Sequence, residues 1–412
     1  MGAREEPARP LEGLRVAITG GAIGGAAAAL LLAARGAQVT LLERVEQPRA
    51  VGAGILLQPN GLAVLYGLGL ESALRRYGTC VNQIAVIDAA RRPVLGGAVP
   101  DYGAGLDHAM GIHRSRLLAA LLDAVAAEPG INARFGASVT GATAAGEVTY
   151  SQHGATHHLL ADLVVGADGV HSRIRDAGAF GAEARHTGVT YVRGMSGYRV
   201  ETSDCYEAWT RLGLFGVCPV EDQTYFFTSA QAPTLAAALA ARDLEAFRRL
   251  WADAFPPSRP ILREIESFDQ LLLNEVVQVH CRSYVDGRSA LLGDAAHAMY
   301  PNLGQGANSA LVDGAVLAAE LAATPGDLSA ALARYDARRR PGARAVQDGA
   351  ARLASLVHLH PPVLHPVRNA TVRGLSRVIG RAGTERQLRK YQQEDPTWLL
   401  SSARRAPATI TA

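Results

Sequence analysis

The chain has 412 residues, 48% of them hydrophobic, and a formal net charge of +3 at pH 7. This length favours two domains, and so small a charge argues against a nucleic-acid or membrane-surface footprint. The four cysteines form no Cys-x-x-Cys pair and none lies at metal-ligand spacing from a histidine. We therefore expect no metal site and a reducing, cytoplasmic setting. The longest apolar run, at 26–34, is too short to span a membrane.

Residues 14–43 have the pattern of one βαβ unit, with a small-residue helix between two short apolar strands. In the turn "GGAIGG", Gly20, Ala22 and Gly25 occupy the three positions of a Gly-x-Gly-x-x-Gly fingerprint. Such a turn lets the backbone approach a diphosphate at the positive end of the helix. The alanine at the middle position adds one methyl group to the usual pattern.

The acidic residue Glu43 closes the second strand 23 residues after Gly20. An acidic side chain at this distance typically accepts hydrogen bonds from a ribose diol. The turn and Glu43 together predict a dinucleotide site, although NAD and FAD share this geometry. The alternative is an ordinary α/β turn followed by an exposed glutamate.

Two further apolar strands are each followed by a lone carboxylate. "ADLVVGADG" ends on Asp168, and "RSALLGDAAH" ends on Asp294. A carboxylate at this edge of an α/β sheet can bind the hydroxyls of a flavin ribityl chain. The helix that opens near Gly306 would direct its N–H groups at the N1–C2=O edge of the flavin. The alternative is that Asp294 only caps the following residues.

Residues 76–102 and 181–282 contain short alternating segments that predict an antiparallel sheet, and 233–255 predicts one or two amphipathic helices. The predicted fold is a Rossmann-like α/β domain interrupted by a mostly antiparallel sheet domain, with helices at the C-terminus. We assign 11–75, 103–180 and 283–345 to the first domain and 76–102 with 181–282 to the second. Residues 346–412 form a C-terminal helical segment and tail.

The stretches "GGAIGG…LLER", "VVGADGVHSRIR" and "GDAAHAMYPNLGQGAN" resemble the three signature stretches of the single-component, class A FAD-dependent monooxygenases. This family includes p-hydroxybenzoate, salicylate and 3-hydroxybenzoate hydroxylases, and the resemblance runs in the expected order from about residue 14 to 345. It implies a set of FAD-binding positions: Gly20, Ala22, Ile23, Gly25, Glu43, Arg44, Arg114, Asp168, Asp294, Gly306, Ala307 and Asn308. It also implies that Pro301 lies beside the reactive carbon of the flavin ring.

The resemblance implies that NADH or NADPH transiently reduces non-covalently bound FAD. Molecular oxygen then forms a flavin hydroperoxide, which passes one oxygen atom to an aromatic or polyketide-like substrate by hydroxylation or epoxidation. No second Gly-x-Gly-x-x-Gly follows a strand, so we expect no separate nicotinamide domain. We expect a monomer or homodimer that binds neither nucleic acid nor membrane.

Three other functions stay open at this point: an FAD-dependent dehydrogenase or reductase that inserts no oxygen, a flavin halogenase, and a flavoprotein that has lost its chemistry. The halogenase is disfavoured because the only lysine, Lys390, lies near the C-terminus.

Arg199, Tyr225 and Phe227 are candidates to face the substrate from the sheet, and packing or solvent exposure is an equal alternative for each. No general base can be named. For His297 we expect a structural hydrogen bond to nearby backbone.

Overall fold

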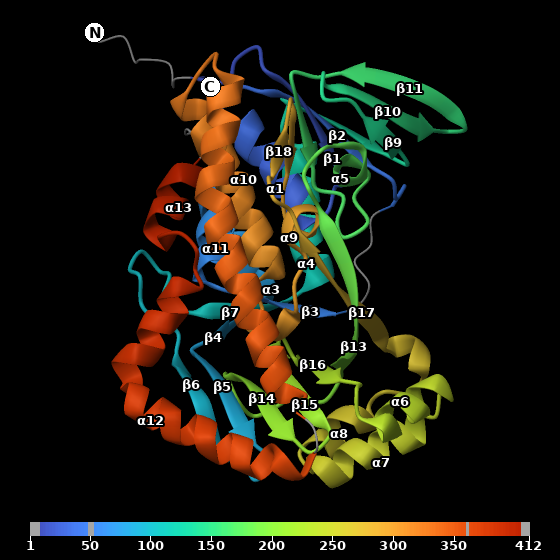
Figure 1. Ribbon diagram of the computed structural model, residues 1–412, viewed down its shortest axis with the longest axis vertical. Coiled ribbons are helices and arrows are strands. Elements are labelled where there is room, and N and C mark those ends of the chain that lie inside the picture. The colour runs from blue at the N-terminus through green and yellow to red at the C-terminus, as the bar shows by residue number, and fades with distance from the viewer. Residues whose placement is uncertain (1–8, 48–52, 360–361, 405–412) are drawn as a thin grey trace.

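The structure is a computed structural model, and it describes residues 9–47, 53–359 and 362–404. Its upper part in Figure 1 is built on a six-stranded sheet in the order β18-β19-β12-β1-β2-β8. All neighbours in this sheet are parallel except the edge pair β18–β19. Its strands are β1 (Arg15–Thr19), β2 (Gln38–Glu43), β8 (Ile131–Phe135), β12 (Leu163–Gly166), β18 (Val285–Asp286) and β19 (Ser289–Leu291).

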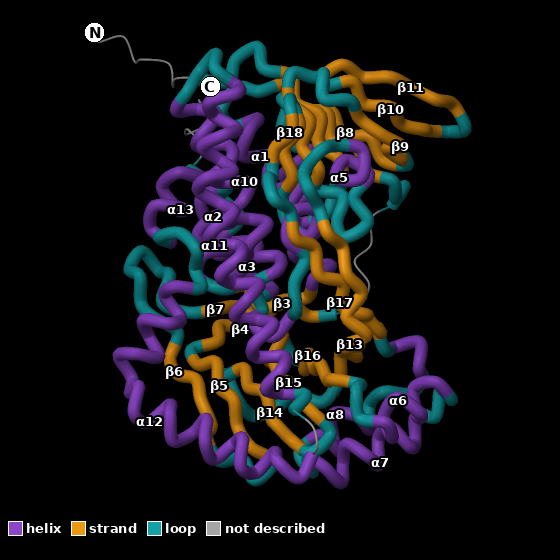
Figure 2. The backbone as a smooth tube through the Cα atoms, viewed as in Figure 1, coloured by secondary structure: helices purple, strands orange, loops and turns teal. Residues whose placement is uncertain are grey.

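The predicted βαβ unit is confirmed: α1 (Ile23–Ala33) connects β1 to the parallel strand β2. The apolar run at 26–34 is therefore a core helix, almost completely buried. Small residues bring α1 against α10 (Gly306–Ala323), because a methyl group added to Gly24 would lie 2.9 Å from Cβ of Ala310. Figure 2 shows these helices on one side of the parallel sheet and a small three-stranded sheet on the other.

The lower part is a seven-stranded sheet in the order β17-β13-β16-β15-β14-β5-β6. Every neighbouring pair is antiparallel except β5–β14, so the mixed fold predicted from the sequence is confirmed. Its strands are β5 (Gln83–Asp88), β6 (Pro93–Ala98), β13 (Glu183–Ser196), β14 (Cys205–Thr210), β15 (Gly213–Val220), β16 (Gln223–Ser229) and β17 (Leu272–His280).

One face of this seven-stranded sheet is covered by helices. Phe215 and Phe226 point from the strands into a core that they share with Trp251. The amphipathic stretch at 233–255 forms two helices, as the sequence allowed. The covering helices are α6 (Pro233–Ala240), α7 (Leu244–Ala254) and α8 (Ser258–Arg263).

A short sheet in the order β3-β7-β4 lies between the two large sheets (Figure 1). The remaining elements before the C-terminal helices connect the sheets or extend the upper one. They are β3 (Gly54–Leu57), α2 (Pro59–Gly67), α3 (Glu71–Tyr77), β4 (Thr79–Val81), β7 (Ala109–His113), α4 (Arg114–Ala126), β9 (Ser138–Ala142), β10 (Glu147–Gln152), β11 (Ala155–Leu160), α5 (Arg173–Ala177), α9 (Asp294–His297) and the 3-10 turns η1 (Phe268–Gln270) and η2 (Pro301–Leu303).

The last long helices of the described residues are α11 (Leu328–Val357), α12 (His365–Lys390), which is kinked at Gly380, and α13 (Pro396–Ala403). α12 runs along β6, and α13 packs against α2. The boundary expected near residue 345 lies inside α11, which passes through Pro341 without a break. The division of the chain into domains stays a prediction. Among the described residues, no helix is both long and apolar enough to cross a membrane.

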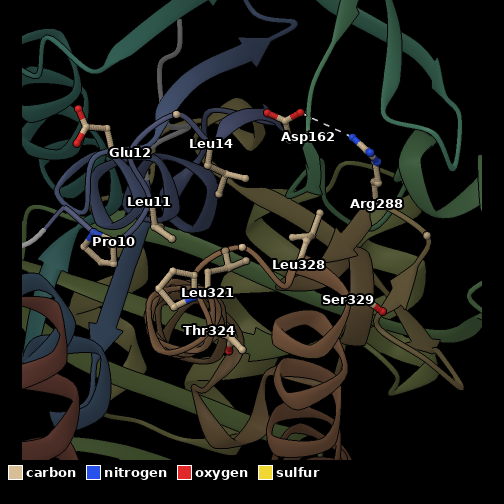
Figure 3. A pocket seen from close by; sticks show the side chains of 14 residues that line it. Pro10, Leu11, Glu12, Leu14, Asp162, Arg288, Leu321, Thr324, Leu328 and Ser329 are labelled. Atoms are coloured by element: carbon tan, nitrogen blue, oxygen red, sulfur yellow. Dashed lines mark ion pairs between the residues drawn. The ribbon is translucent and has the colours of Figure 1, made fainter.

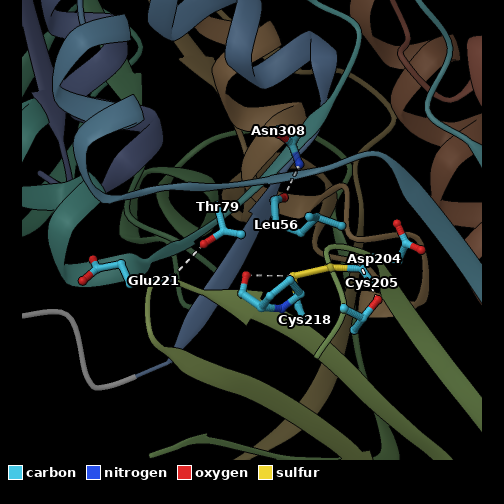
Figure 4. Close-up of a disulfide and its surroundings, with 9 residues drawn as sticks. Leu56, Thr79, Asp204, Cys205, Cys218, Glu221 and Asn308 are labelled. Carbon is cyan, nitrogen blue, oxygen red and sulfur yellow. Dashed lines mark hydrogen bonds between the residues drawn. A yellow bond between two sulfur atoms is a disulfide. The ribbon is translucent and has the colours of Figure 1, made fainter. Parts of the chain in front are cut away.

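A disulfide joins Cys205 on β14 to Cys218 on β15, with their Cα atoms 4.5 Å apart (Figure 4). Nothing in the spacing of the cysteines predicts this pair, because only the register of the two strands places them opposite each other. The other two cysteines, Cys80 and Cys281, are free.

Candidate active site

Four of the predicted groups lie one after another along the same edge of the upper sheet. β19, β12, β1 and β2 are neighbours and run parallel, so their carboxyl ends meet at the same edge. These ends lead, in this order, to Asp294, Asp168, the turn at Gly20 and Glu43. Ligands of open α/β sheets bind at this edge.

The glycine turn is shaped for close backbone contact. Gly20 has φ +95°, and a methyl group there would lie 2.4 Å from the carbonyl oxygen of Ala167. A methyl group on Gly25 would lie 1.9 Å from the carbonyl oxygen of Gly20, so this helix position requires glycine. Ala22 precedes α1, makes no side-chain cap and is exposed, whereas Ile23 is buried in the core. The N–H groups that begin α1 therefore face an open surface.

The carboxylate of Glu43 lies against this turn. One oxygen accepts a hydrogen bond from the N–H of Gly21 at 2.7 Å, and the other accepts one from the N–H of Val45 at 2.8 Å. Each oxygen keeps a lone pair for a further donor. Arg44 beside it is exposed. Glu43 is therefore half-buried rather than exposed, with its carboxylate held by the backbone next to the turn, and its role as a ribose ligand stays a prediction.

Asp168 provides the strongest sign of a missing partner. Its Oδ2 accepts the N–H of Arg173 at 2.7 Å at the start of α5, while its Oδ1 is buried and has no hydrogen-bond partner within the described chain. Burial raises the pKa of this carboxyl group. A buried polar atom without a partner is costly unless a ligand satisfies it. This orphan atom, together with the glycine cradle, fits a bound dinucleotide.

Asp294 is exposed at the first position of the short helix α9. A methyl group added to Gly306 would lie 4.0 Å from its Oδ1, so the carboxylate stands beside the start of α10. Neither α9 nor α10 has a side-chain cap, which leaves the proposed capping role of Asp294 without support. Between the two helices, Pro301 opens η2 and is half-buried, and Gly304 adopts φ +62°.

The side chain of Asn308 is fully occupied within the protein. Its Nδ2 donates to the carbonyl oxygens of Leu56 and Gly304 at 3.1 and 2.8 Å, and its Oδ1 accepts the N–H of Gln58 at 3.0 Å. The predicted contact with the flavin ring can therefore be made by backbone groups, those of Gly306, Ala307 and Asn308. Since the first N–H groups of a helix have no partner within it, they are suited to that contact.

His297 does not bond to nearby backbone, so that expectation is wrong. Its Nε2 lies 2.6 Å from Oδ2 of Asp313, and both side chains are buried. The other oxygen of Asp313 accepts from Nε of the buried Arg339 at 2.7 Å. The N–H of Gly293 also donates to Asp313 at 2.8 Å, which fixes the strand end before Asp294.

The predicted substrate candidates divide into two groups. Tyr225 and Phe227 lie on the face of the lower sheet that α6–α8 do not cover, with ring centroids 5.5 Å apart. Burial raises the pKa of Tyr225, and the charges of Arg193 and of Arg114, an exposed residue that begins α4, oppose this rise. Arg199 is exposed on the loop after β13. Arg193, opposite Phe227 in the sheet, joins this face instead.

Sequence reasoning missed Arg193 and Glu207, two charged residues on this face. Both are half-buried. The signal that could have found them is the alternation of side chains along a strand: in "CYEAWT" a lone glutamate occupies the same face as Cys205 and Trp209.

A pocket of about 470 Å³ lies elsewhere, at the opposite edge of the upper sheet (Figure 3). Asp162 and Arg288, which line it, precede β12 and β19, and Leu321 and Leu328 come from α10 and α11. No predicted site residue lines this pocket. Within the described part of the chain, no group of histidine, cysteine or acidic residues could hold a metal ion.

The comparisons with known proteins agree with this geometry. Residues 13–350 match the family model described as "FAD binding domain". The chain is 32% identical over 390 residues to aurachin C monooxygenase/isomerase of Stigmatella aurantiaca, covering 91% of this chain and 98% of that protein. It is 33% identical over 362 residues to 3-amino-4-hydroxybenzoate 2-monooxygenase of Streptomyces cremeus, covering 84% and 88%.

Among solved structures, the tetrameric form of 2-methyl-3-hydroxypyridine-5-carboxylic acid oxygenase superposes with a TM-score of 0.74 and 26% identity. The match covers 93% of this chain and 97% of that one. Since the family model spans most of the chain and the relatives are matched over nearly their full length, the chain belongs to the FAD-binding family of single-component flavoprotein monooxygenases.

Proposed function

We propose that this monooxygenase inserts one oxygen atom from O2 into an aromatic small molecule, and that FAD lies along the carboxyl edge of the upper sheet. The observation that carries the proposal is the order of groups on that edge: Glu43, the turn at Gly20, Asp168 and Asp294, followed by the start of α10. This order matches the order of groups along one extended dinucleotide, from its adenosine ribose to its flavin ring.

Each part of the edge has a separate task in this proposal. The N–H groups that begin α1, after the Gly21 N–H already bound by Glu43, hold the diphosphate at the positive end of the helix, with Ala22, Ile23 and Gly25 forming the cradle. Glu43 accepts the ribose hydroxyls, and Arg44 lies beside it.

At the flavin end, Asp294 accepts the ribityl hydroxyls, and Oδ1 of Asp168 gains its missing partner from the cofactor. Arg114 approaches the pyrophosphate from α4. The backbones of Gly306, Ala307 and Asn308 stabilise negative charge on the ring edge. When bound, FAD supplies electrons taken from NADH or NADPH and the activated oxygen atom.

The substrate lies between Pro301 and the face of the lower sheet opposite to α6–α8. Tyr225 and Phe227 offer aromatic surface there, and the sheet keeps water from the reacting centre. Aromatic substrates are supported by the relatives, whose names include 3-amino-4-hydroxybenzoate 2-monooxygenase and 6-hydroxynicotinate 3-monooxygenase.

The test is a screen of aromatic acids and quinolones for stimulated NAD(P)H oxidation, followed by product analysis under heavy-oxygen O2. We expect flavin reduction to accelerate at least about tenfold with the right compound, which corresponds to only ~1.4 kcal/mol in the barrier. The product should carry one oxygen atom from O2. A product formed without O2, or one with oxygen from water, would replace this function with the FAD-dependent dehydrogenase.

A further inference from the structure

Glu207 and Arg193 belong to one row of side chains across the lower sheet. The register places Val86, Glu207, Gly216, Phe227 and Arg193 directly opposite one another on successive strands. Residues that face each other in neighbouring strands point to the same side of the sheet. This side is the one that α6–α8 leave uncovered, since the alternate residues form the core beneath those helices.

The row faces the segment that follows Asp294. Tyr191, two residues before Arg193 on the same face, donates from its hydroxyl to Oδ1 of Asn302 in η2 at 2.8 Å. Tyr300 packs into the same apolar cluster as Tyr191 and Val86. The face therefore lies under Pro301, where the proposed function places the reacting ring.

The middle of the row is occupied by the phenyl ring of Phe227, which we call the aromatic floor. A methyl group on Gly216 would lie 2.1 Å from Cζ of Phe227, so the phenyl ring extends across Gly216 towards β14. Glu207 stands at one end of this floor and Arg193 at the other. Their backbones are separated by three strand spacings, about 14 Å.

Each of the two charged residues lacks a partner of opposite charge. Among the described residues, no ion pair involves Glu207 or Arg193, and the only hydrogen bond to the glutamate comes from Nε1 of Trp209 at a long 3.4 Å. Burial raises the pKa of Glu207 to about 7, with Trp209 opposing weakly. Unpaired, half-buried charges of this kind concentrate at functional sites, where a substrate satisfies them.

The titratable groups nearest to Glu207 do not neutralise it. Tyr191 on β13 lies within electrostatic reach of Glu207, and Tyr191 is also within reach of Tyr300 and Arg193. Arg368 of α12 lies over the Trp209 ring at 5.0 Å. On β5, Asp88 is engaged by Arg92 and Arg373, each at 2.8 Å.

We propose that Glu207 accepts the proton of a hydroxyl or N–H group on the aromatic substrate, and that Arg193 binds a carboxylate or carbonyl oxygen at the other end. This inference rests on the proposed function and defines its substrate class: one or two fused aromatic rings with a proton donor and an anionic or carbonyl oxygen on opposite sides. The ring itself stacks on Phe227.

The proton transfer balances with the monooxygenase reaction. The O–H or N–H bond of the substrate breaks, its electron pair moves into the ring, and the proton forms an O–H bond on Glu207. The electron-rich ring carbon then takes one oxygen atom of O2 as a hydroxyl group, and transfer of the proton on that carbon back to the substrate oxygen or nitrogen restores aromaticity. The second oxygen atom leaves as water with the proton from Glu207 and one proton from the reduced cofactor, whose two electrons come from NADH or NADPH.

The experiment uses the FAD-loaded enzyme and three probes: 3-amino-4-hydroxybenzoate and 6-hydroxynicotinate, which carry a carboxylate, and 4(1H)-quinolone, which carries only a carbonyl. Variants are Glu207→Gln and Arg193→Gln, with Glu275→Gln on the exposed edge strand β17 as the matched control. Dissociation constants are measured by flavin fluorescence across the pH range, and hydroxylation is measured with heavy-oxygen O2.

We expect wild-type turnover to rise with pH around a midpoint near the raised pKa of Glu207. Glu207→Gln should lower kcat at least about tenfold and remove this pH dependence, while flavin content and probe-free flavin reduction stay unchanged. Arg193→Gln should raise the dissociation constant at least about tenfold for the two carboxylates and less for the quinolone. Glu275→Gln should match the wild type.

Unchanged turnover and an unchanged pH profile in Glu207→Gln would overturn the inference while the monooxygenase function stands. Probes that bind but yield no labelled product would instead remove the proposed reaction. The inference is then decided by binding alone: it survives only if Glu207→Gln alters the pH dependence of the dissociation constant. Failure of all three probes to bind would overturn the substrate class itself.

Discussion

The carbonyl oxygen of Gly20 lies where a side chain of Gly25 would begin: a methyl group on Gly25 would approach it to 1.9 Å. The first turn of α1 therefore packs on the end of β1 with no space for a side chain, and this contact positions the N–H groups of the diphosphate turn.

Gly25→Ala should therefore distort the turn. Overpacking against backbone costs about 1–3 kcal/mol of unfolding free energy, and the displaced N–H groups should lose FAD. The measurement is thermal unfolding with and without added FAD, together with the flavin content of the purified protein. Gly141→Ala is the control, because a methyl group there meets nothing within 4 Å. Full flavin content in Gly25→Ala would show that the turn does not hold the diphosphate.

Asp294→Ala should separate cofactor binding from stability. The carboxylate is exposed and caps no helix, so its loss should hardly change the unfolding of the FAD-free protein. Charge-assisted hydrogen bonds to ribityl hydroxyls are worth roughly 1.5–3 kcal/mol, so FAD should bind about one to two orders of magnitude more weakly. Asp294→Asn should be milder. FAD that survives extensive dialysis of the alanine variant would contradict the assignment.

The buried contacts of Asp313 predict acid sensitivity. Burial works to raise the pKa of Asp313, but the charges of His297 and Arg339 outweigh it and hold the pKa well below its ordinary value. A lowered folded-state pKa stabilises the protein above the ordinary aspartate pKa, and this stability is lost as the pH falls towards the folded value.

Asp313→Asn should cost about 3–5 kcal/mol near neutral pH, because Arg339 keeps a buried charge without its partner. The variant should also lose the acid-side dependence described above. Urea unfolding of both proteins from about pH 7 downward measures this. Parallel curves for wild type and variant would show that Asp313 does not provide the dependence.

The buried carboxylate of Glu207 predicts that stability changes with pH in the opposite direction to that expected from Asp313. Burial raises its pKa from 4.5 to about 7, so the unfolded chain releases this proton at lower pH than the folded protein does. Stability should therefore fall as the pH rises through that interval, by about 3 kcal/mol at most. Glu207→Gln should be more stable than the wild type at about pH 8 and lose this advantage near pH 5. Equal stability at both values would show that the carboxylate is well solvated.

The glycine between the two charges offers a test of the aromatic floor. Gly216→Ala should displace the ring of Phe227, because the added methyl group and Cζ cannot both occupy their positions. We expect a loss of about 1–3 kcal/mol of unfolding free energy and weaker binding of all three aromatic probes, with FAD binding unchanged. Flavin fluorescence measures both affinities. Unaltered probe binding would place the substrate elsewhere.

The sequence by itself determined the parallel half of the fold and the groups on its edge. Glu43 ends a strand, and Gly20, Asp168 and Asp294 each follow one within a few residues, so local periodicity and turn chemistry were enough to find them. Their roles in binding FAD stay predictions, but the edge they share follows directly from parallel pairing.

Only the tertiary structure decided which residues form the opposite face. Glu207 and Arg193 come from different strands, and their common row depends on the register of five strands, which no local pattern encodes. Three other contacts depend equally on how distant segments meet. They are the pairing of His297 with Asp313, the disulfide between Cys205 and Cys218, and the hydrogen bond from the N–H of Gln58 to Asn308. Local sequence specifies elements and their ends, whereas contacts between elements arise from packing that the whole chain determines.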